Sequence, residues 1–402
     1  MFELNRFIAE HVTKRQSSMF CADIERNETD LHKKIDGKTI LVIGGAGSIG
    51  SSFIKAILAY EPKTLVVVDV NENALTELTR ELRSSKKIHI PCDYVTYPMD
   101  YASEVFFKMY RARKGFDIVA NFSAHKHVRS EKDVYSIEAL LRNNVINAKK
   151  LLDVLCECPP EEYFCVSTDK AANPVNIMGA SKRIMEDLIF SYSNKFPVKT
   201  ARFANVAFSN GSLPEGFLNR IVKLQPISAP SDIKRYFVSP EESGQICMLS
   251  CMLGQNREIF FPKLETEQMM SFDKIAIELL KAKGYEVLYC NSDEEAIDKM
   301  EQVINGSKQY PVYFSKSDTS GEKAFEEFYT SNEIVNFDRF ISMGVIEEKN
   351  SINTDQIEIL IDELENMFAN NDVKKDEIIG LIRKYLPNFE HIETGKNLDS
   401  KM

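Results

Sequence analysis

Short apolar runs alternate with amphipathic stretches along the first half of the chain. The apolar runs are rich in β-branched and aromatic residues, and we expect strands at Thr39–Ile43, Leu65–Asp69, Ile88–Cys92, Asp117–Phe122, Tyr163–Ser167 and Val198–Phe203. The stretches between them have helical periodicity and predict helices at Ser48–Tyr60, Asn73–Ser84, Ala102–Arg113, Ser136–Cys156 and Met178–Lys195. Such alternation is typical of βαβ units with right-handed crossovers. The pattern therefore predicts a doubly wound parallel sheet covered by helices.

The pattern changes on both sides of this region, which divides the chain into four parts. Residues 1–37 are polar and mixed and predict a helical arm, whereas residues 38–204 hold the alternating strands and helices. Residues 205–330 are rich in Pro, Ser and turn residues and predict mainly a smaller α+β lobe, from which the chain can cross back to the sheet. Residues 331–402 predict a helical extension, because Ile357–Met367 and Ile378–Ile382 repeat apolar residues at helical spacing. We expect these helices to pack on the core or on a partner subunit.

Composition and charge exclude some classes of protein. The chain has 402 residues and a formal net charge of −10, which argues against a nucleic-acid-binding surface. No apolar run approaches the roughly 20 residues of a membrane span, and the N-terminus lacks the apolar core of a signal peptide. The eight cysteines form no Cys-x-x-Cys pair and stand beside no histidines at metal-ligand spacing. We expect reduced thiols, no metal site and a cytoplasmic protein.

A glycine-rich turn joins the first expected strand to the first expected helix. Gly44, Gly47 and Gly50 have the spacing G-x-x-G-x-x-G. In a Rossmann-type βαβ unit, the first glycine allows the tight turn, the second lets the backbone approach a pyrophosphate, and the third packs helix on strand. The amides of Ser48, Ile49 and Gly50 would face the phosphates from the helix N-terminus. The turn therefore predicts a dinucleotide site.

The ends of the following strands carry further candidates. Asp69 ends the second strand, where its carboxylate would accept hydrogen bonds from an adenosine ribose and repel a 2′-phosphate. No Arg directly follows it, so we favour NAD over NADP. Asp100-Tyr101 either holds the adenine or caps a helix. After the fourth strand, Ser123-Ala124 would lie at the nicotinamide ribose. Lys126-His127 follow them, and we favour a substrate contact for Lys126 over a solvated loop lysine.

Ser167-Thr168-Asp169-Lys170 ends the fifth strand and precedes a pair of residues at helical spacing. Met178 and Lys182 stand at i and i+4, which places both on one helix face. In short-chain dehydrogenases this is the place of a Tyr-x-x-x-Lys pair, whose Lys lowers the pKa of the phenol so that it acts as a base. A thioether cannot accept a proton in that role. Either the site is inactive, or Thr168, Asp169 and Lys170 carry the proton chemistry.

Five segments together resemble the nucleotide-sugar 4,6-dehydratases of the extended short-chain dehydrogenase/reductase branch. They are STDKAANPVNIMGASKR, NFSAHKHV, ARFANVAFSNGS, KRYFVSPEESGQI and SGEKAFEE. More narrowly, they look like the polysaccharide-biosynthesis group that acts on UDP-N-acetylglucosamine, and the resemblance covers residues 36–330. It implies that NAD takes hydride from sugar C4, a base removes the C5 proton, an acid protonates the departing C6 hydroxyl, and hydride returns to C6.

The resemblance also implies a role for each residue of the catalytic run. Thr168 would bond the C4 oxygen, Asp169 would be the acid, Lys170 the base, and Lys182 would hold the nicotinamide ribose. Met178 places the chain with relatives that retain the configuration at C5. Other implied contacts are to the cofactor from Asn144 and Ser167, and to the UDP-sugar from Lys126, His127, Asn173, Asn205, Arg235, Glu322 and Lys323.

Two alternatives stay open at this point. A UDP-sugar 4-epimerase shares the oxidation at C4 but normally uses Tyr, so Met178 counts against it. A non-catalytic sensor of NAD or a nucleotide sugar would have lost its Tyr, but the intact Thr168-Asp169-Lys170 run counts against that. The segments Glu265–Ser271 and Gly284–Pro311 depart from the family pattern. The resemblance further implies a homo-oligomer, at least a dimer, paired through the helices expected at 102–113 and 136–156.

Overall fold

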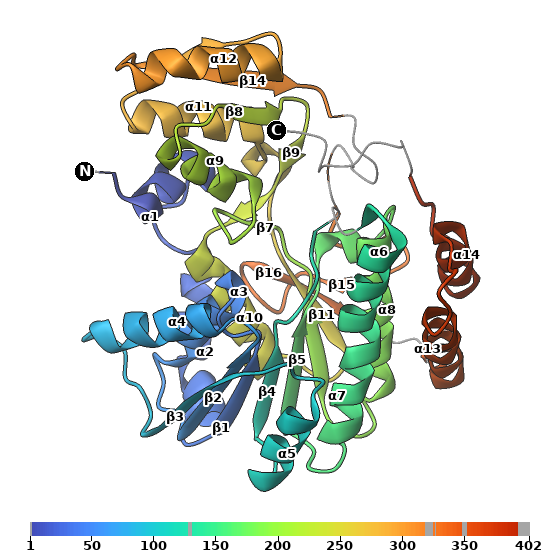
Figure 1. The fold of residues 1–402 in the computed structure, drawn as a ribbon. Helices are drawn as coiled ribbons and strands as arrows, with labels where there is room; N and C mark the ends of the chain where they lie inside the picture. The colour runs from blue at the N-terminus through green and yellow to red at the C-terminus, as the bar shows by residue number, and fades with distance from the viewer. Residues whose placement is uncertain (1, 128–130, 318–324, 326, 348–351, 393–402) are drawn as a thin grey trace.

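The computed structural model describes residues 2–127, 131–317, 325, 327–347 and 352–392, and Figure 1 shows a larger and a smaller lobe. The larger lobe holds a nine-stranded sheet in the order β15-β16-β11-β6-β5-β4-β1-β2-β3. Seven strands are parallel, whereas β16 is antiparallel to both β11 and β15. The strand bounds are β1 Thr39–Ile43, β2 Thr64–Asp69, β3 Asp93–Pro98, β4 Ile118–Asn121, β5 Glu162–Val166, β6 Val198–Ala201, β11 Glu258–Pro262, β15 Val335–Asn336 and β16 Met343–Glu347.

The predicted doubly wound sheet is confirmed, and one of its six predicted strands is wrong. Residues 88–92 form no strand, and β3 lies at Asp93–Pro98 instead. Pro91 lacks an amide hydrogen and so cannot donate to a ladder. β3 is the edge strand, and most of its residues are only partly buried. An edge strand does not need the continuous apolar run that marks a central parallel strand, so the apolar pattern misplaced it.

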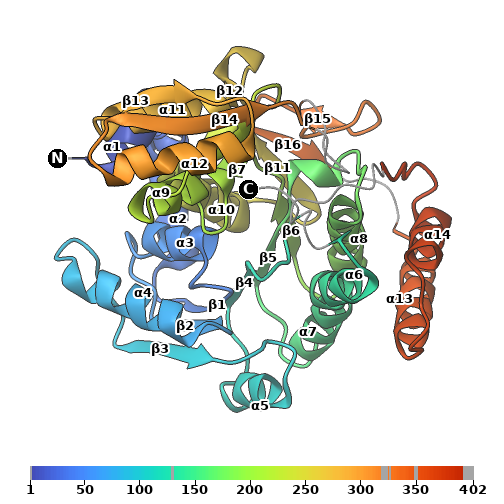
Figure 2. The ribbon, with the colours of Figure 1, turned by 45° about the horizontal axis from the view of Figure 1, so that its top comes forward.

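Helices cover both faces of the sheet, as Figures 1 and 2 show. One face carries α2 (Cys21–Ile35), α3 (Ser48–Ile57), α4 (Glu72–Ser84) and α10 (Pro240–Leu253). The other carries α5 (Glu104–Ala112), α6 (Val134–Leu141), α7 (Asn147–Leu155) and α8 (Ile177–Ser191). The helix predicted at 136–156 is α6 and α7 joined by a π-helical turn, η3, at Arg142–Ile146. The carboxyl ends of the parallel strands face the smaller lobe, so side chains that follow them meet between the lobes.

The smaller lobe repeats the βαβ arrangement on a reduced scale. Its sheet, β13-β14-β8, is parallel throughout, which refines the predicted α+β mixture. The strands are β8 Ile227–Pro230, β13 Glu286–Tyr289 and β14 Gln309–Ser315, and the helices are α9 Leu213–Val222, α11 Phe272–Ala282 and α12 Asp293–Ile304. Two short strand pairs lie near the junction of the lobes, β7 (Asn205–Val206) with β10 (Phe237–Val238) and β9 (Lys234–Arg235) with β12 (Met270–Ser271).

The N-terminal arm contacts both lobes. Helix α1 (Leu4–Phe7) and the π-helical turn η1 (Ile8–Val12) pack in the core of the smaller lobe, whereas α2 packs on α10 of the larger one. Between them, Arg15 donates from Nε and Nη2 to the two carboxylate oxygens of Glu242, each at 2.7 Å. The predicted helical arm is therefore confirmed, and it joins the two lobes.

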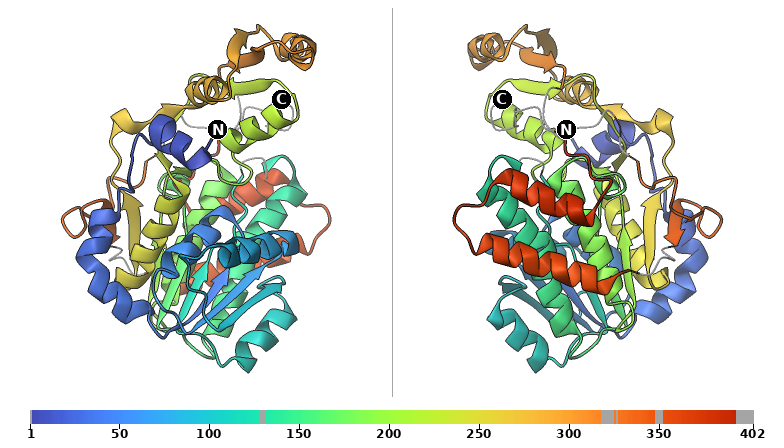
Figure 3. Two further views of the ribbon diagram at one scale, coloured as in Figure 1. Left: turned by 90° about the vertical axis from the view of Figure 1, so that its left-hand side faces the viewer. Right: turned by 90° about the vertical axis from the view of Figure 1, so that its right-hand side faces the viewer.

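The C-terminal helices lie against the outside of the larger lobe. Helices α13 (Thr354–Phe368) and α14 (Lys375–Tyr385) cover α8 and η3, as Figure 3 shows, and their apolar residues join the main core. Packing on the core is thus confirmed. The helical prediction for 331–402 is wrong in its first part, because β15 and β16 complete the sheet there. The subunit contact through the helices at 102–113 and 136–156 stays a prediction, and α13 already packs on part of the second helix.

No helix among the described residues is both long and apolar enough to cross a membrane. Within the same residues, no group of three or more His, Cys, Asp or Glu side chains is arranged to hold a metal ion.

Candidate active site

The glycine-rich turn follows β1 at the carboxyl edge of the sheet. Gly44 has φ +68°, and a Cβ there would lie 2.6 Å from the backbone nitrogen of Ser123. A Cβ on Gly50 would lie 2.4 Å from the carbonyl oxygen of Gly44. Both positions therefore require glycine for reasons of backbone geometry and packing.

Gly47 differs from its two neighbours in the motif. Its φ is −72°, and a Cβ there would meet only the carbonyl oxygen of Gly44, at 3.4 Å. The protein itself therefore does not need a glycine at this position. Because Gly47 has no side chain, a phosphate has space to approach the amides of residues 48–50 at the N-terminus of α3. Asp69 ends β2 beside this turn, where Oδ2 accepts a hydrogen bond from the amide of Ala46 at 3.1 Å. The residues present fit a dinucleotide.

The predicted adenine and nicotinamide-ribose contacts lie on the same edge. Asp100 accepts a hydrogen bond from the amide of Ala102, and the N-cap of α5 is Ser103. The Tyr101 side chain is buried, and its hydroxyl donates to the carbonyl of Asn143 at 2.6 Å. Ser123 packs against Gly44, and Ala124 follows it. These contacts leave the Tyr101 phenol facing the protein core rather than a ligand.

Asn144 holds the segment after β4 against helix α8. Its Oδ1 accepts from the amide of His125, while Nδ2 donates to the carbonyl of His125 and to Oγ of Ser181, at 2.9, 2.9 and 3.0 Å. The side chain is buried, and both of its polar atoms are engaged within the protein. Asn144 therefore shapes the site through the backbone of His125 rather than by a free amide.

A loop after β7 connects the glycine-rich turn to the segment after β4. The amide of Asn210 donates to Oγ of Ser48 at 2.8 Å, and its carbonyl accepts from Nζ of Lys126 at 2.9 Å. A Cβ on Gly211 would lie 3.0 Å from Nε2 of His127, so that ring lies against the same loop. The structure therefore brings Ser48, Lys126 and His127 together.

The candidate catalytic residues form a hydrogen-bonded cluster at the end of β5. Oδ1 of Asp169 accepts from Oγ1 of Thr168 at 2.7 Å and from Nζ of Lys170 at 3.1 Å. The Asp169 side chain is 4% exposed and that of Lys170 19%. Thr168 caps the short 3-10 helix η4 (Asp169–Ala171), which directs all three side chains from one turn. An acid and an amine in contact, both largely out of water, can exchange a proton with little reorganisation.

Met178 and Lys182 lie on the same face of α8, as predicted, and both are buried. The amide of Met178 donates to Oε1 of Glu131 at 3.0 Å. Nζ of Lys182 donates to the carbonyl of Val166 at 2.8 Å, directly behind Ser167. Burial lowers the pKa of Lys182, although the nearby Cys165 and Glu186 work to raise it. Lys182 therefore lies against the carboxyl end of β5.

The predicted substrate ligands that are described lie around the junction of the lobes. Asn205 has a buried side-chain nitrogen with no hydrogen-bond partner among the described residues. An unpaired buried donor is costly, so it marks a place where a ligand oxygen would be stabilising. The neighbouring Arg235 is 5% exposed and donates from Nη1 to the carbonyl of Lys234. Asn173 donates to Oε2 of Glu327 at 2.9 Å. Glu322 and Lys323 lie outside the described residues.

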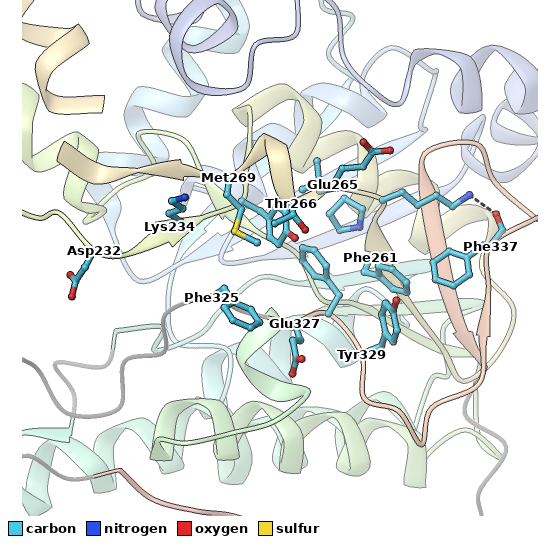
Figure 4. Close-up of a pocket in the computed structure, with 15 residues that line it drawn as sticks. Asp232, Lys234, Phe261, Glu265, Thr266, Met269, Phe325, Glu327, Tyr329 and Phe337 are labelled. Atoms are coloured by element: carbon cyan, nitrogen blue, oxygen red, sulfur yellow. Dashed lines mark hydrogen bonds between the residues drawn. The ribbon is translucent and has the colours of Figure 1, made fainter. Parts of the chain in front are cut away.

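An aromatic pocket of about 800 Å³ opens beside these residues, and Figure 4 shows its lining. It lies beyond the carboxyl end of β11, and the ring centroid of Phe261 lies 5.8 Å from that of Phe328 and 5.2 Å from that of Tyr329. The catalytic cluster does not line it. The hydrogen bond between Asn173 and Glu327 joins the pocket wall to the loop after Lys170. Lining residues are Asp232, Lys234, Tyr236, Phe261, Pro262, Lys263, Leu264, Glu265, Thr266, Met269, Phe325, Glu327, Phe328, Tyr329 and Phe337.

Sequence reasoning missed the residues that support this edge from behind. Oγ of Ser167, assigned to the cofactor, donates instead to Oε1 of Glu186 at 2.6 Å. Glu186 follows Lys182 by one helical turn, so extending the i, i+4 spacing would have found it. Glu131 pairs with Nε2 of His391 at 3.1 Å, a contact for which the sequence holds no local signal.

Comparisons with known proteins indicate the family of this chain. Residues 40–340 match the polysaccharide biosynthesis protein family. An uncharacterised membrane protein of Methanocaldococcus jannaschii is 32% identical over 326 residues, covering 79% of this chain and 88% of that protein. A UDP-N-acetylglucosamine 4,6-dehydratase (inverting) of Campylobacter jejuni is 24% identical, covering 78% and 89%. The probable polysaccharide biosynthesis protein EpsC of Bacillus subtilis is 28% identical over 75% of this chain, which spans about half (49%) of that protein.

Solved structures share the fold at lower identity. Pen from Bacillus thuringiensis has a TM-score of 0.63 at 20% identity, covering 88% of this chain and 98% of that one. A dTDP-glucose 4,6-dehydratase from Streptomyces venezuelae, solved with NAD bound, has a TM-score of 0.53 at 18% identity, covering 72% and 88%.

Proposed function

This chain belongs to the polysaccharide biosynthesis protein family, an extended branch of the short-chain dehydrogenase/reductases, and from that premise we propose that it is a UDP-N-acetylglucosamine 4,6-dehydratase. The product would be the UDP-linked 4-keto-6-deoxy sugar. The observation that carries the proposal is the partly buried contact between Asp169 and Lys170 at the end of β5. An elimination needs a base for the C5 proton and an acid for the C6 hydroxyl, and this pair supplies both.

A dinucleotide would bind along the glycine-rich turn, with Asp69 at its adenosine ribose and Lys182 near its nicotinamide end. Asp69 favours NAD over NADP because a carboxylate repels a 2′-phosphate. When bound, the nicotinamide supplies the hydride acceptor for C4 and the hydride donor for C6. Thr168 would hold the C4 oxygen by a hydrogen bond.

The proton chemistry follows from the contact between the two catalytic side chains. As an ion pair, Lys170 holds the proton and Asp169 does not, which is the opposite of what elimination requires. Transfer along their 3.1 Å hydrogen bond gives a neutral amine and a neutral acid without any change in total charge. Exclusion of water favours the neutral pair, because a buried charge is poorly solvated. Lys170 then takes the C5 proton, and Asp169 gives its proton to the leaving hydroxyl, which departs as water.

Retention at C5 follows from the same assignment. After elimination, Lys170 holds the proton that it took from C5, on the face from which it came. Inversion would require a second acid on the opposite face, and the thioether of Met178 has no proton to give. We therefore propose retention, in contrast to the C. jejuni relative whose name carries the label inverting.

The nucleotide would bind between the lobes. Nδ2 of Asn205 and the guanidinium of Arg235 are suited to diphosphate oxygens, since charge-assisted bonds from Arg are the strong ones. The aromatic pocket beside them can stack a nucleobase against its rings.

The test is incubation of the purified protein with UDP-N-acetylglucosamine, followed by mass spectrometry and NMR of the product in D₂O. Dehydration gives a product lighter by one water. Retention leaves the configuration at C5 unchanged, whether the atom returned to C5 is hydrogen or deuterium. An isobaric product would identify a 4-epimerase, and no product together with tight NAD binding would identify a sensor. Either result would contradict the proposal.

Two substitutions test the assigned roles. Lys170→Met and Asp169→Asn should each lower kcat by at least about 10²-fold, because each removes one proton-transfer group. Both should keep the affinity for NADH, measured by fluorescence titration. Lys33→Met, on an exposed face of α2, is the matched control and should behave as the parent. Near-normal turnover of either catalytic variant would contradict its role.

A further inference from the structure

A fully buried arginine lies behind the catalytic strand end. Arg202 follows β6 and has no exposed surface. Nε and Nη2 donate to the two carboxylate oxygens of Glu186 at 2.8 and 2.6 Å. Nη1 donates to Oε2 of Glu333 at 2.9 Å and to the carbonyl of Phe328 at 3.1 Å, and Nη2 lies 2.8 Å from Oε1 of Glu333. The guanidinium therefore makes four hydrogen bonds and lies within ion-pair distance of both carboxylates.

One side of this network contacts the catalytic strand end. Oε1 of Glu186 also accepts the hydroxyl of Ser167, which directly precedes Thr168. Glu186 lies on α8, on the same face as Lys182 and Met178, and its side chain is fully buried. The carboxylate therefore joins the helix behind the site to the end of β5.

The other side contacts the wall of the aromatic pocket. Phe328 lines that pocket, and Glu333 follows it in the same segment, where its Oε2 also accepts the amide of Thr330 at 2.7 Å. Arg183 adds a second cation at 3.3 Å from Oε1 of Glu333. Asp187 lies 3.3 Å from Nη2 of Arg183, so three carboxylates, those of Glu186, Glu333 and Asp187, surround the two guanidinium groups. Burial works to raise the pKa of Glu333, but the hydrogen bond and charge of Arg202, together with the Thr330 amide and the charge of Arg183, lower that pKa.

We propose that Arg202 is a positioning residue that holds the pocket wall at 327–333 and the strand end at 167–170 as one body. The proposal rests on the proposed function, since it assigns the pocket wall to the nucleotide and the strand end to the sugar. The guanidinium of Arg202 is planar and rigid. A displacement of one carboxylate therefore moves Arg202 and weakens its hydrogen bonds to the other carboxylate. Occupation of the pocket and alignment of Thr168, Asp169 and Lys170 therefore depend on each other.

Glu333→Gln tests this coupling with little change of shape. Gln keeps one oxygen acceptor and the side-chain length but removes a charge, while Glu186 still neutralises Arg202. The control is Arg15→Gln, which breaks another buried pair, with Glu242, in the N-terminal arm. Both variants should lower the melting temperature, so loss of stability alone does not distinguish a positioning role from a structural one.

Hydrogen–deuterium exchange on the ligand-free protein is the first measurement. The amides of residues 167–172 should exchange about tenfold faster or more in Glu333→Gln, and at the parent rate in Arg15→Gln. Kinetics is the second measurement. Glu333→Gln should raise KM for UDP-N-acetylglucosamine about fivefold and lower kcat, with NADH affinity unchanged.

The positioning role would be overturned if the amides of residues 167–172 exchanged in Glu333→Gln at the parent rate. It would also be overturned if their exchange rate rose equally in Arg15→Gln. If the parent forms no product, the proposed function fails while the exchange comparison still decides this inference. Should Glu333→Gln fail to fold, Glu333→Asp keeps the charge with a shorter reach, and it should give a smaller increase in exchange at the same amides.

Discussion

The cofactor end and the substrate end of the site lie on one sheet edge but are built differently. At the cofactor end, backbone groups make the contacts that shape the turn, such as the amide of Ala46, which donates to Asp69. At the substrate end, Arg202 joins Glu186 to Glu333, and the second of these contacts spans 131 residues. The first end depends on backbone conformation, and the second on charges that meet only after folding. Substitutions at the two ends should therefore differ in their effects on stability and ligand binding.

The largest expected effect comes from removal of the buried cation. Arg202→Met leaves Glu186 and Glu333 buried with less compensation, and breaking such a network costs about 3–5 kcal/mol of unfolding free energy. Urea denaturation measures this loss. Adding Glu333→Gln to Arg202→Met should recover part of it, because one uncompensated charge is removed. A loss below about 1 kcal/mol would show that water or Arg183 replaces the missing cation.

A smaller effect is expected at the cofactor end, where two glycines can be compared. Gly50→Ala places a Cβ 2.4 Å from the carbonyl of Gly44, and such overpacking costs about 1–3 kcal/mol. Gly47→Ala meets nothing closer than 3.4 Å and should cost about 1 kcal/mol or less. Both should weaken NADH binding, measured by fluorescence titration. If Gly47→Ala binds NADH as the parent does, the dinucleotide does not approach this turn as we propose.

The smallest expected effect is a trend with pH at Lys182, which lies between the two ends. Burial lowers the pKa of this amine in the folded protein below its ordinary value of 10.5. Below the folded pKa the buried charge destabilises the fold, and this cost disappears as the pH rises through the folded pKa toward 10.5. The stability of Lys182→Met relative to the parent should therefore decline over that range. Thermal unfolding of both proteins across alkaline pH measures it, and a flat difference would contradict a lowered pKa.

The two ends also differ in how far the sequence predicted them. The strand β1, the glycine turn, Asp69 and the Thr168-Asp169-Lys170 run were all located from local patterns. The strand β3 was misplaced because an edge strand does not need a continuous apolar run. The aromatic pocket and the network around Arg202 were not predicted, although ARFANVAF and the helix that carries Glu186 were both recognised. A charged residue in a sequence resembles a surface residue until its partners are known.

By itself, the sequence determined the features that depend on neighbouring residues. These are the parallel alternation of strands and helices, the glycine turn, and the common helix face of Met178 and Lys182. Their geometry is set within a few residues by backbone dihedrals and side-chain periodicity. Only the tertiary structure decided which distant segments meet, and so which carboxylates surround Arg202 and which rings form the pocket. A buried charge is stable only where opposite charges and hydrogen-bonding groups surround it, and these groups come together only when the chain folds.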